Sequence, residues 1–62
     1  MLDDKDLKVD GRYRYQDLGS GPIEVRVTKI EGDGVFALIE GPGGYEKRWA
    51  IDTFKRYATK IV

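Results

Sequence analysis

Hydrophobic and polar residues alternate along two runs near the middle of the chain. Residues 23–28 read Ile-Glu-Val-Arg-Val-Thr, and residues 35–40 read Val-Phe-Ala-Leu-Ile-Glu. A period of two is typical of a β-strand with one buried face. Because the turn-forming residues Gly32, Asp33 and Gly34 separate the two runs, the pattern predicts one long β-hairpin.

The register of this hairpin decides which side chains enter the core. A three-residue loop ending at Gly34 places Val27 opposite Ile39 and Arg26 opposite Glu40, so that hydrophobic residues face each other and opposite charges pair. A two-residue turn ending at the same glycine would instead place Val27 opposite Glu40. We therefore predict the three-residue loop, with Gly34 at a positive φ.

The second face of the hairpin changes character along its length. Glu24 and Arg26 lie at the open end, whereas Ile30, Phe36 and Leu38 lie near the turn. Both faces near the turn are therefore hydrophobic. This predicts a hairpin that bends so that its two halves join different sheets of a small barrel.

Local signals before the hairpin predict two further elements. Residues 1–9 favour one helical turn capped by Asp3 or Asp4. Residues 12–16 alternate Arg or Gln with Tyr, which predicts a first strand whose tyrosine rings pack while their hydroxyls stay in water. Pro22 cannot donate a hydrogen bond to a sheet and is expected to begin the second strand.

Signals after the hairpin predict a fourth strand. The Gly-Pro-Gly-Gly cluster at residues 41–44 is a turn signal, and the following residues 45–51 alternate again. Trp49 is expected in the core, because a chain this small needs the large area that one buried tryptophan supplies.

The end of the chain allows two interpretations. In the first, Asp52 caps a C-terminal helix from Thr53 to Lys60, with hydrophobic residues at helical spacing. In the second, one helical turn at Phe54–Tyr57 is followed by a fifth strand at Ala58–Val62, which its β-branched residues favour.

Composition limits the chain to one domain and to few kinds of site. With 62 residues and 40% hydrophobic content, we expect a single domain over residues 1–62, with residues 1–9 as an N-terminal extension and residues 53–60 as the C-terminal helix. The chain has no cysteine and no histidine, and its 11 basic and 11 acidic residues balance. Because no signal peptide and no membrane span is recognisable, we expect a soluble, cytoplasmic monomer.

The order of these elements resembles the SH3-like small barrel. The features that carry the resemblance are the tyrosine-bearing first strand, the glycine-rich loop, the long hairpin, the strand with Trp49 and the Asp-Thr-Phe sequence at residues 52–54. Residues 25–35 are similar to the central hairpin of Tudor-type barrels. The resemblance implies a mostly β fold, an SH3-like barrel of four to five antiparallel strands with a short C-terminal helix. The short loops also resemble those of computationally designed small barrels.

The sequence contains no recognisable catalytic or metal-binding constellation, so we expect no catalysis, no metal and no cofactor. Basic and aromatic residues on the strands form the candidate binding surface for nucleic acid or peptide. Its members are Arg12, Tyr13, Arg14, Tyr15, Arg26, Tyr45, Lys47 and Arg48. The leading hypothesis is a designed scaffold with no dedicated activity. The alternative is a natural SH3-like or Tudor-like module that binds nucleic acid or peptide.

Overall fold

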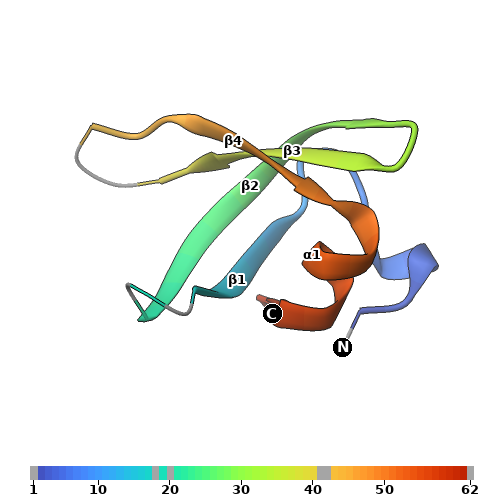
Figure 1. Cartoon of the computed structure of the whole chain (residues 1–62), viewed down its shortest axis with the longest axis horizontal. Helices are drawn as coiled ribbons and strands as arrows, with labels where there is room; N and C mark the ends of the chain where they lie inside the picture. The colour runs from blue at the N-terminus through green and yellow to red at the C-terminus, as the bar shows by residue number, and fades with distance from the viewer. Residues whose placement is uncertain (1, 18, 20, 41–42, 62) are drawn as a thin grey trace.

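The computed structural model describes residues 2–17, 19, 21–40 and 43–61. Its elements are η1 (Asp4–Asp6), β1 (Arg12–Asp17), β2 (Gly21–Glu31), β3 (Gly34–Ile39), β4 (Glu46–Ala50), α1 (Ile51–Tyr57) and β5 (Ala58–Lys60). The five strands form one antiparallel sheet in the order β4-β3-β2-β1-β5 (Figure 1). The predicted fold class, mostly β with a short C-terminal helix, is therefore confirmed.

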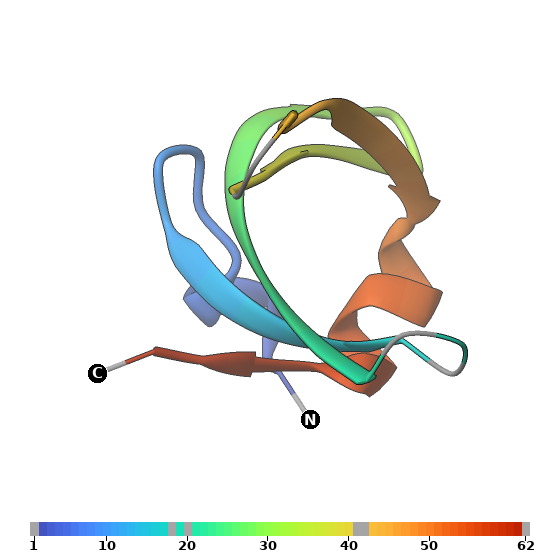
Figure 2. The same ribbon diagram turned by 90° about the vertical axis from the view of Figure 1, so that its left-hand side faces the viewer.

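The sheet curls but does not close into a barrel. Figure 2 shows the strands bending around a common interior, with β2 strongly curved. The sheet order leaves β4 and β5 as its two edges, and within the described part of the chain no strand pairing joins them. The expected barrel is therefore an open, curled sheet in this structure. The reason is local, because α1 begins directly after β4 and carries the chain out of the sheet before β5 starts.

The register of the β2–β3 hairpin differs from the predicted one. The turn consists of Gly32 and Asp33, and Glu31 lies opposite Gly34. Gly32 has a φ of 58°, which suits the first position of a type II′ turn, whereas Gly34 does not have a positive φ. The predicted three-residue loop with Gly34 at a positive φ is therefore wrong.

A β-bulge at Thr28 explains how a two-residue turn keeps hydrophobic residues inside. Ile30 lies opposite Val35 next to the turn, the register then shifts between Val27 and Lys29, and Val27 lies opposite Ala37. One extra residue in β2 thus restores the inward position of the hydrophobic residues beyond the bulge.

The same register separates the two charges that were expected to pair. Arg26 lies opposite Leu38, not opposite Glu40. The side chain of Glu40 pairs instead with Arg12 on β1. The predicted ion pair between Arg26 and Glu40 is therefore wrong, because Glu40 pairs with Arg12.

The C-terminal segment is closer to the second of the two interpretations, but α1 begins at Ile51 rather than Phe54 and β5 ends at Lys60, and Val62 lies outside the described residues. The helix ends at Tyr57, not at Lys60, and β5 follows at once, with Ala58 opposite Tyr15 on β1. The N-cap residue is Ala50, which makes no side-chain cap, and Asp52 lies in the first turn. The expected cap at Asp52 is therefore wrong.

The N-terminal segment packs against the domain. Leu2 is a buried core residue, and its N–H donates to the Lys55 carbonyl at 2.9 Å. Asp4 forms an ion pair with Lys55 on α1. The predicted helical turn exists as the short η1, but its N-cap residue Asp3 makes no side-chain cap.

The core lies between the concave face of the sheet and α1. Trp49 is part of it, as predicted, and so is Tyr13. The Tyr13 hydroxyl does not stay in water. It donates to the Asp6 carbonyl at 2.5 Å and accepts from the Lys8 N–H at 3.0 Å. Among the residues that the structure describes, the buried hydrophobic ones are Leu2, Tyr13, Tyr15, Val25, Val27, Val35, Ala37, Trp49, Phe54 and Ala58.

Candidate functional site

The structure does not bring the eight candidate residues together on one surface. Tyr13 and Tyr15 point into the core, so their rings are not available to stack on bases at the surface. The alternate residues of β1 and β2 carry Arg12, Arg14 and Arg26, which are exposed. The remaining three candidates, Tyr45, Lys47 and Arg48, are exposed on β4 or just before it.

The arginines on the outer face of the sheet are accompanied by carboxylates. Arg12 Nε lies 3.2 Å from Glu40 Oε1, and Arg12 Nη2 lies 3.8 Å from Glu24 Oε2. Arg14 lies opposite Glu24 in the β1–β2 ladder. The outer face therefore presents mixed charge rather than the positive field that attracts a phosphate backbone.

The free outer edge of β4 offers backbone groups for hydrogen bonding. In the β3–β4 ladder, the Ile39 N–H donates to the Tyr45 carbonyl, and the Ile51 N–H donates to the Asp33 carbonyl. Hydrogen-bonded pairs alternate along an antiparallel ladder, so the odd-numbered residues of β4 face β3. The N–H and C=O groups of Glu46 and Arg48 therefore point away from β3, along an edge with no neighbouring described strand.

A row of aromatic rings lies beside this edge on the inner face. The ring centroids of Trp49 and Tyr15 are 4.8 Å apart, and those of Tyr15 and Tyr57 are 6.3 Å apart. Tyr57 is 39% exposed, whereas Trp49 and Tyr15 are buried. We call these three residues the aromatic row. They connect β4 through β1 to α1.

The charged side chains of β4 differ in their partners. The Thr28 hydroxyl donates to Glu46 Oε2 at 2.7 Å, and Arg48 Nη2 lies 3.2 Å from Asp33 Oδ1. Lys47 makes no ion pair with any residue that the structure describes, and its Nζ lies 5.4 Å from the centre of the Trp49 ring. Lys47 is therefore the unpaired charge of this edge.

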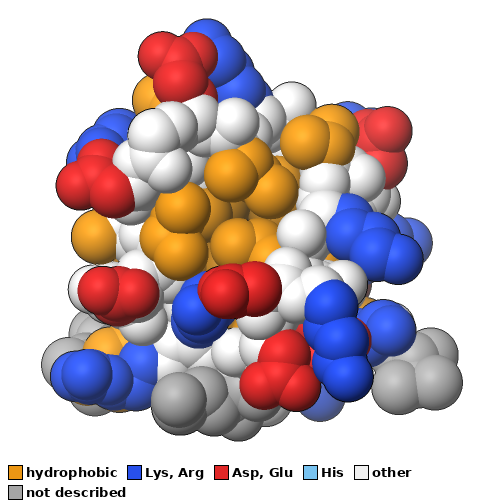
Figure 3. Space-filling model, turned by 90° about the vertical axis from the view of Figure 1, so that its right-hand side faces the viewer, with side chains coloured by type: hydrophobic (Ala, Val, Ile, Leu, Met, Phe, Trp, Pro, Cys, Tyr) orange, Lys and Arg blue, Asp and Glu red, His pale blue; other side chains and the backbone are white. Residues whose placement is uncertain are grey.

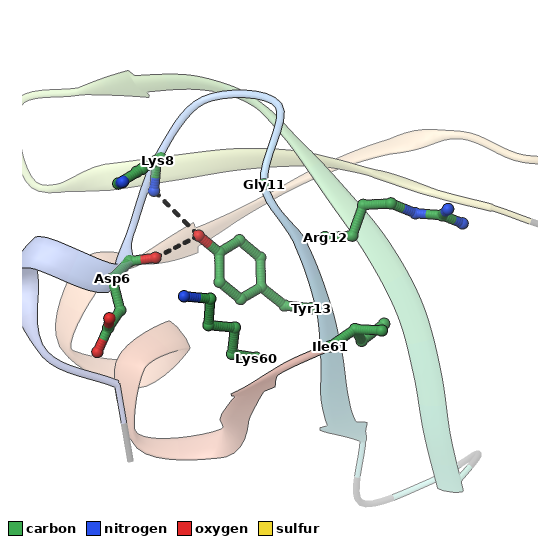
Figure 4. Close-up of a pocket in the computed structure, with 7 residues that line it drawn as sticks. All are labelled: Asp6, Lys8, Gly11, Arg12, Tyr13, Lys60 and Ile61. Atoms are coloured by element: carbon green, nitrogen blue, oxygen red, sulfur yellow. Dashed lines mark hydrogen bonds between the residues drawn. The ribbon is translucent and has the colours of Figure 1, made fainter.

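The cavity in Figure 4 lies where residues 6–13 and β5 meet, and its volume is about 150 Å³. The Lys60 side chain points toward Asp6 and the Tyr13 hydroxyl, whereas the Arg12 side chain points away from Tyr13. The Asp6 backbone carbonyl points toward the Tyr13 hydroxyl, whereas the Asp6 carboxylate points away from it. The lining residues include both acidic and basic ones, so the cavity does not select a ligand of either sign.

A second cavity of about 280 Å³ lies between the β2–β3 turn and the start of α1. Gly32, Asp33, Ala50, Ile51 and Asp52 line it. The side of the molecule that carries this turn shows hydrophobic side chains gathered at its centre and charges of both signs around them (Figure 3). The cavity is wide and bears two exposed carboxylates, so it has no enclosed polar group that would orient a ligand.

Two exposed ion pairs shift the titration of their partners. The hydrogen bond from Lys29 lowers the pKa of Glu31, and the same contact, 2.6 Å long, raises the pKa of Lys29. The hydrogen bond to Asp4 raises the pKa of Lys55. These groups are at the surface, so they are not the desolvated acids or bases of a catalytic site.

Among residues 2–17, 19, 21–40 and 43–61, no cluster of side chains could hold a metal ion. In the same part of the chain, no helix is long and apolar enough to cross a membrane. Comparison with family models, with curated proteins and with solved structures finds no match to this chain.

The sequence pattern predicts that Lys47 and Arg48 lie on a strand surface, but it does not predict that this strand is an edge of the sheet. The sequence predicts that Trp49 is a core residue and that Tyr57 lies on the hydrophobic side of the C-terminal helix. It does not predict that both residues contact the Tyr15 ring. The alternation of residues 45–51 carried the relevant signal. It could not show that β4 lies at the end of the sheet, because strand order depends on long-range pairing.

Proposed function

We propose that this chain is a non-catalytic binding domain that takes up an extended peptide along the outer edge of β4. The free N–H and C=O groups of Glu46 and Arg48 carry this proposal, since a peptide in β-conformation can bond to them and extend the sheet. Trp49 lies on that edge strand, and Tyr57, which is 39% exposed, is the member of the aromatic row whose ring reaches the surface.

We also propose that the domain belongs with the SH3-like small barrels. The sheet order β4-β3-β2-β1-β5, the strong curvature of β2 and the helix between β4 and β5 support this. A computationally designed origin is part of the same proposal, and the two-residue turn and the bulge in β2 support it. Asp10, with a φ of 70°, is a less idealised choice.

Peptide binding is better supported than nucleic-acid binding. A single-stranded nucleic acid needs exposed rings next to unpaired cations. On the outer face, Arg12 is paired with Glu40, and the neighbouring rings of Tyr13 and Tyr15 are buried. The edge of β4, in contrast, combines the ring of Trp49 with backbone groups and one cation, Lys47, that have no partner among the described residues.

The test is a titration of isotope-labelled protein with the blocked peptide Thr-Glu-Thr-Val-Thr. We expect amide shifts at Glu46 and Arg48 and a change in the fluorescence of Trp49, the only tryptophan of the chain. Two versions of the peptide, N-methylated at alternate nitrogens in either phase, serve as controls. One of them should stop binding and the other should not, because only alternate N–H groups of a strand face its neighbour.

The variant Arg48→Pro removes one N–H that faces outward and no N–H that bonds to β3. We expect it to fold and to bind roughly two- to tenfold more weakly, since one hydrogen bond is lost. Lys47→Pro is the matched control, because it removes an N–H that faces β3 and should reduce stability instead.

Unchanged spectra at millimolar peptide would contradict the proposal and would support a scaffold without dedicated activity. Shifts at Arg12, Arg14 and Arg26 on adding mixed oligonucleotides, with strong salt dependence, would favour nucleic-acid binding instead.

A further inference from the structure

We infer that Lys47 makes the β4 edge selective for peptides with an acidic side chain two residues away from a hydrophobic one. This inference rests on the proposed strand addition and adds the class of peptide that the edge prefers. Its basis is the position of Lys47 and Trp49 on β4 and the contacts of the neighbouring charges.

Lys47 and Trp49 lie on the same face of β4, because side chains two residues apart in a strand share a face. Lys47 is opposite Ala37 and Trp49 is opposite Val35 in the β3–β4 ladder. Both partners are buried on the concave side of the sheet. A strand added to β4 therefore places every second side chain on this face, one beside Lys47 and one beside Trp49.

The charge that selects the peptide must come from Lys47. Glu46 already accepts a hydrogen bond from Thr28, and Arg48 is paired with Asp33. Lys47 is exposed, and its ammonium lies over the face of the Trp49 ring, without an ion-pair partner among the described residues. An incoming carboxylate pairs with that ammonium, and an incoming aliphatic side chain packs near Trp49.

The same lysine opposes pairing between two copies of the chain. A charged side chain that points to the inner face of an edge strand discourages edge-to-edge association, because pairing brings it close to its counterpart. An antiparallel pair of β4 strands centred on Lys47 would place two ammonium groups opposite each other, which destabilises the pair. The acidic peptide meets no such repulsion.

The experiment compares three blocked peptides, Thr-Glu-Thr-Val-Thr, Thr-Gln-Thr-Val-Thr and Thr-Lys-Thr-Val-Thr, by amide shifts and Trp49 fluorescence. We expect the Glu peptide to bind roughly two- to fivefold more tightly than the Gln peptide, as an exposed ion pair allows. This preference should shrink in 1 M NaCl, where the Debye length is about 3 Å.

The variant Lys47→Gln should bind the Glu and Gln peptides equally, and Lys47→Glu should prefer the Lys peptide. Arg14→Gln is the matched control. It removes the same charge from an exposed strand position that has no ion pair among the described residues, and it should keep the wild-type preference. Sedimentation of each variant shows whether a changed preference reflects self-association.

The outcomes separate the two proposals. If all three peptides shift Glu46 and Arg48 equally, in the wild type and in both Lys47 variants, strand addition stands and the selectivity is overturned. If no peptide shifts these amides, both proposals fail. If Arg14→Gln changes the preference as much as Lys47→Gln does, the selectivity comes from overall charge and the role of Lys47 is overturned.

Discussion

At the scale of single residues, the period of two predicts which side of a strand a residue occupies, but it does not predict its hydrogen-bond partner. Tyr13 occupies an inward position, as the alternation of residues 12–16 indicates. Its hydroxyl lies under the N-terminal segment and bonds to the backbone of Asp6 and Lys8. A tyrosine expected to keep its hydroxyl in water instead holds residues 6–8 against the sheet.

Tyr13→Phe should therefore reduce the free energy of unfolding by about 1–3 kcal/mol, because the Asp6 carbonyl and the Lys8 N–H lose their partner in a partly buried place. Urea denaturation should show a lower midpoint with an unchanged slope. Tyr57→Phe is the control. The Tyr57 ring is 39% exposed, and its hydroxyl makes no hydrogen bond with a described residue. The urea midpoint of Tyr57→Phe should therefore stay near that of the wild type.

At the scale of elements, the turn and the bulge of the β2–β3 hairpin act together. A two-residue turn alone would have moved the hydrophobic residues of β2 to the outer face beyond Thr28. The bulge corrects this, so Val25 and Val27 remain fully buried. The sequence between residues 31 and 34 allows several turns, and only the packing of both halves of the hairpin selects one.

Alanine at the two hairpin glycines tests this register. Gly32→Ala should cost about 1–2 kcal/mol, because its backbone is left-handed. Gly34→Ala should cost less. The added Cβ would lie 2.5 Å from Arg48 Nε, but the Arg48 side chain is 52% exposed and can move aside to relieve this contact. Thermal unfolding of both variants measures the order, and the opposite order would indicate a loop with Gly34 at the positive φ.

At the scale of the whole molecule, aromatic packing takes over the role that strand pairing plays in a closed barrel. Phe54 on α1 lies 5.7 Å from Trp49 and 5.6 Å from Tyr13, measured between ring centroids. These contacts tie the helix to β4 at one edge of the sheet and to β1 beside the other edge. The gap between β4 and β5 is thus bridged by side chains, which leaves the backbone edge of β4 open.

Trp49→Ala should cost about 3–5 kcal/mol, since it removes the largest side chain of this bridge. That loss is close to the total stability of a small domain, roughly 5 kcal/mol at the lower end of the usual range. Circular dichroism should show a mostly unfolded chain at 25 °C. Trp49→Phe keeps a ring in place and should stay folded with a lowered midpoint. A folded Trp49→Ala variant would contradict this role of the residue.

The sequence by itself determined the approximate strand segments, the inward residues of β1, the core position of Trp49 and the two possible structures of the C-terminal segment. These properties depend on local periodicity and on the burial that a chain of 62 residues requires. The sequence placed Lys47 on an outer face together with Arg48, whereas Lys47 lies on the concave side, opposite Ala37. The candidate site was predicted only in part, because Lys47 and Arg48 were named but their edge was not.

Only the tertiary structure decided the hairpin register, the choice of a strand after Tyr57 and the open edge of β4. Each depends on contacts between residues far apart in the chain. Ala58 pairs with Tyr15 across 43 positions, and this pairing ends the helix where local propensity alone would let it continue. It also places β5 beside β1, away from β4, and so leaves the Glu46 and Arg48 backbone groups without a neighbouring strand in the part of the chain that the structure describes.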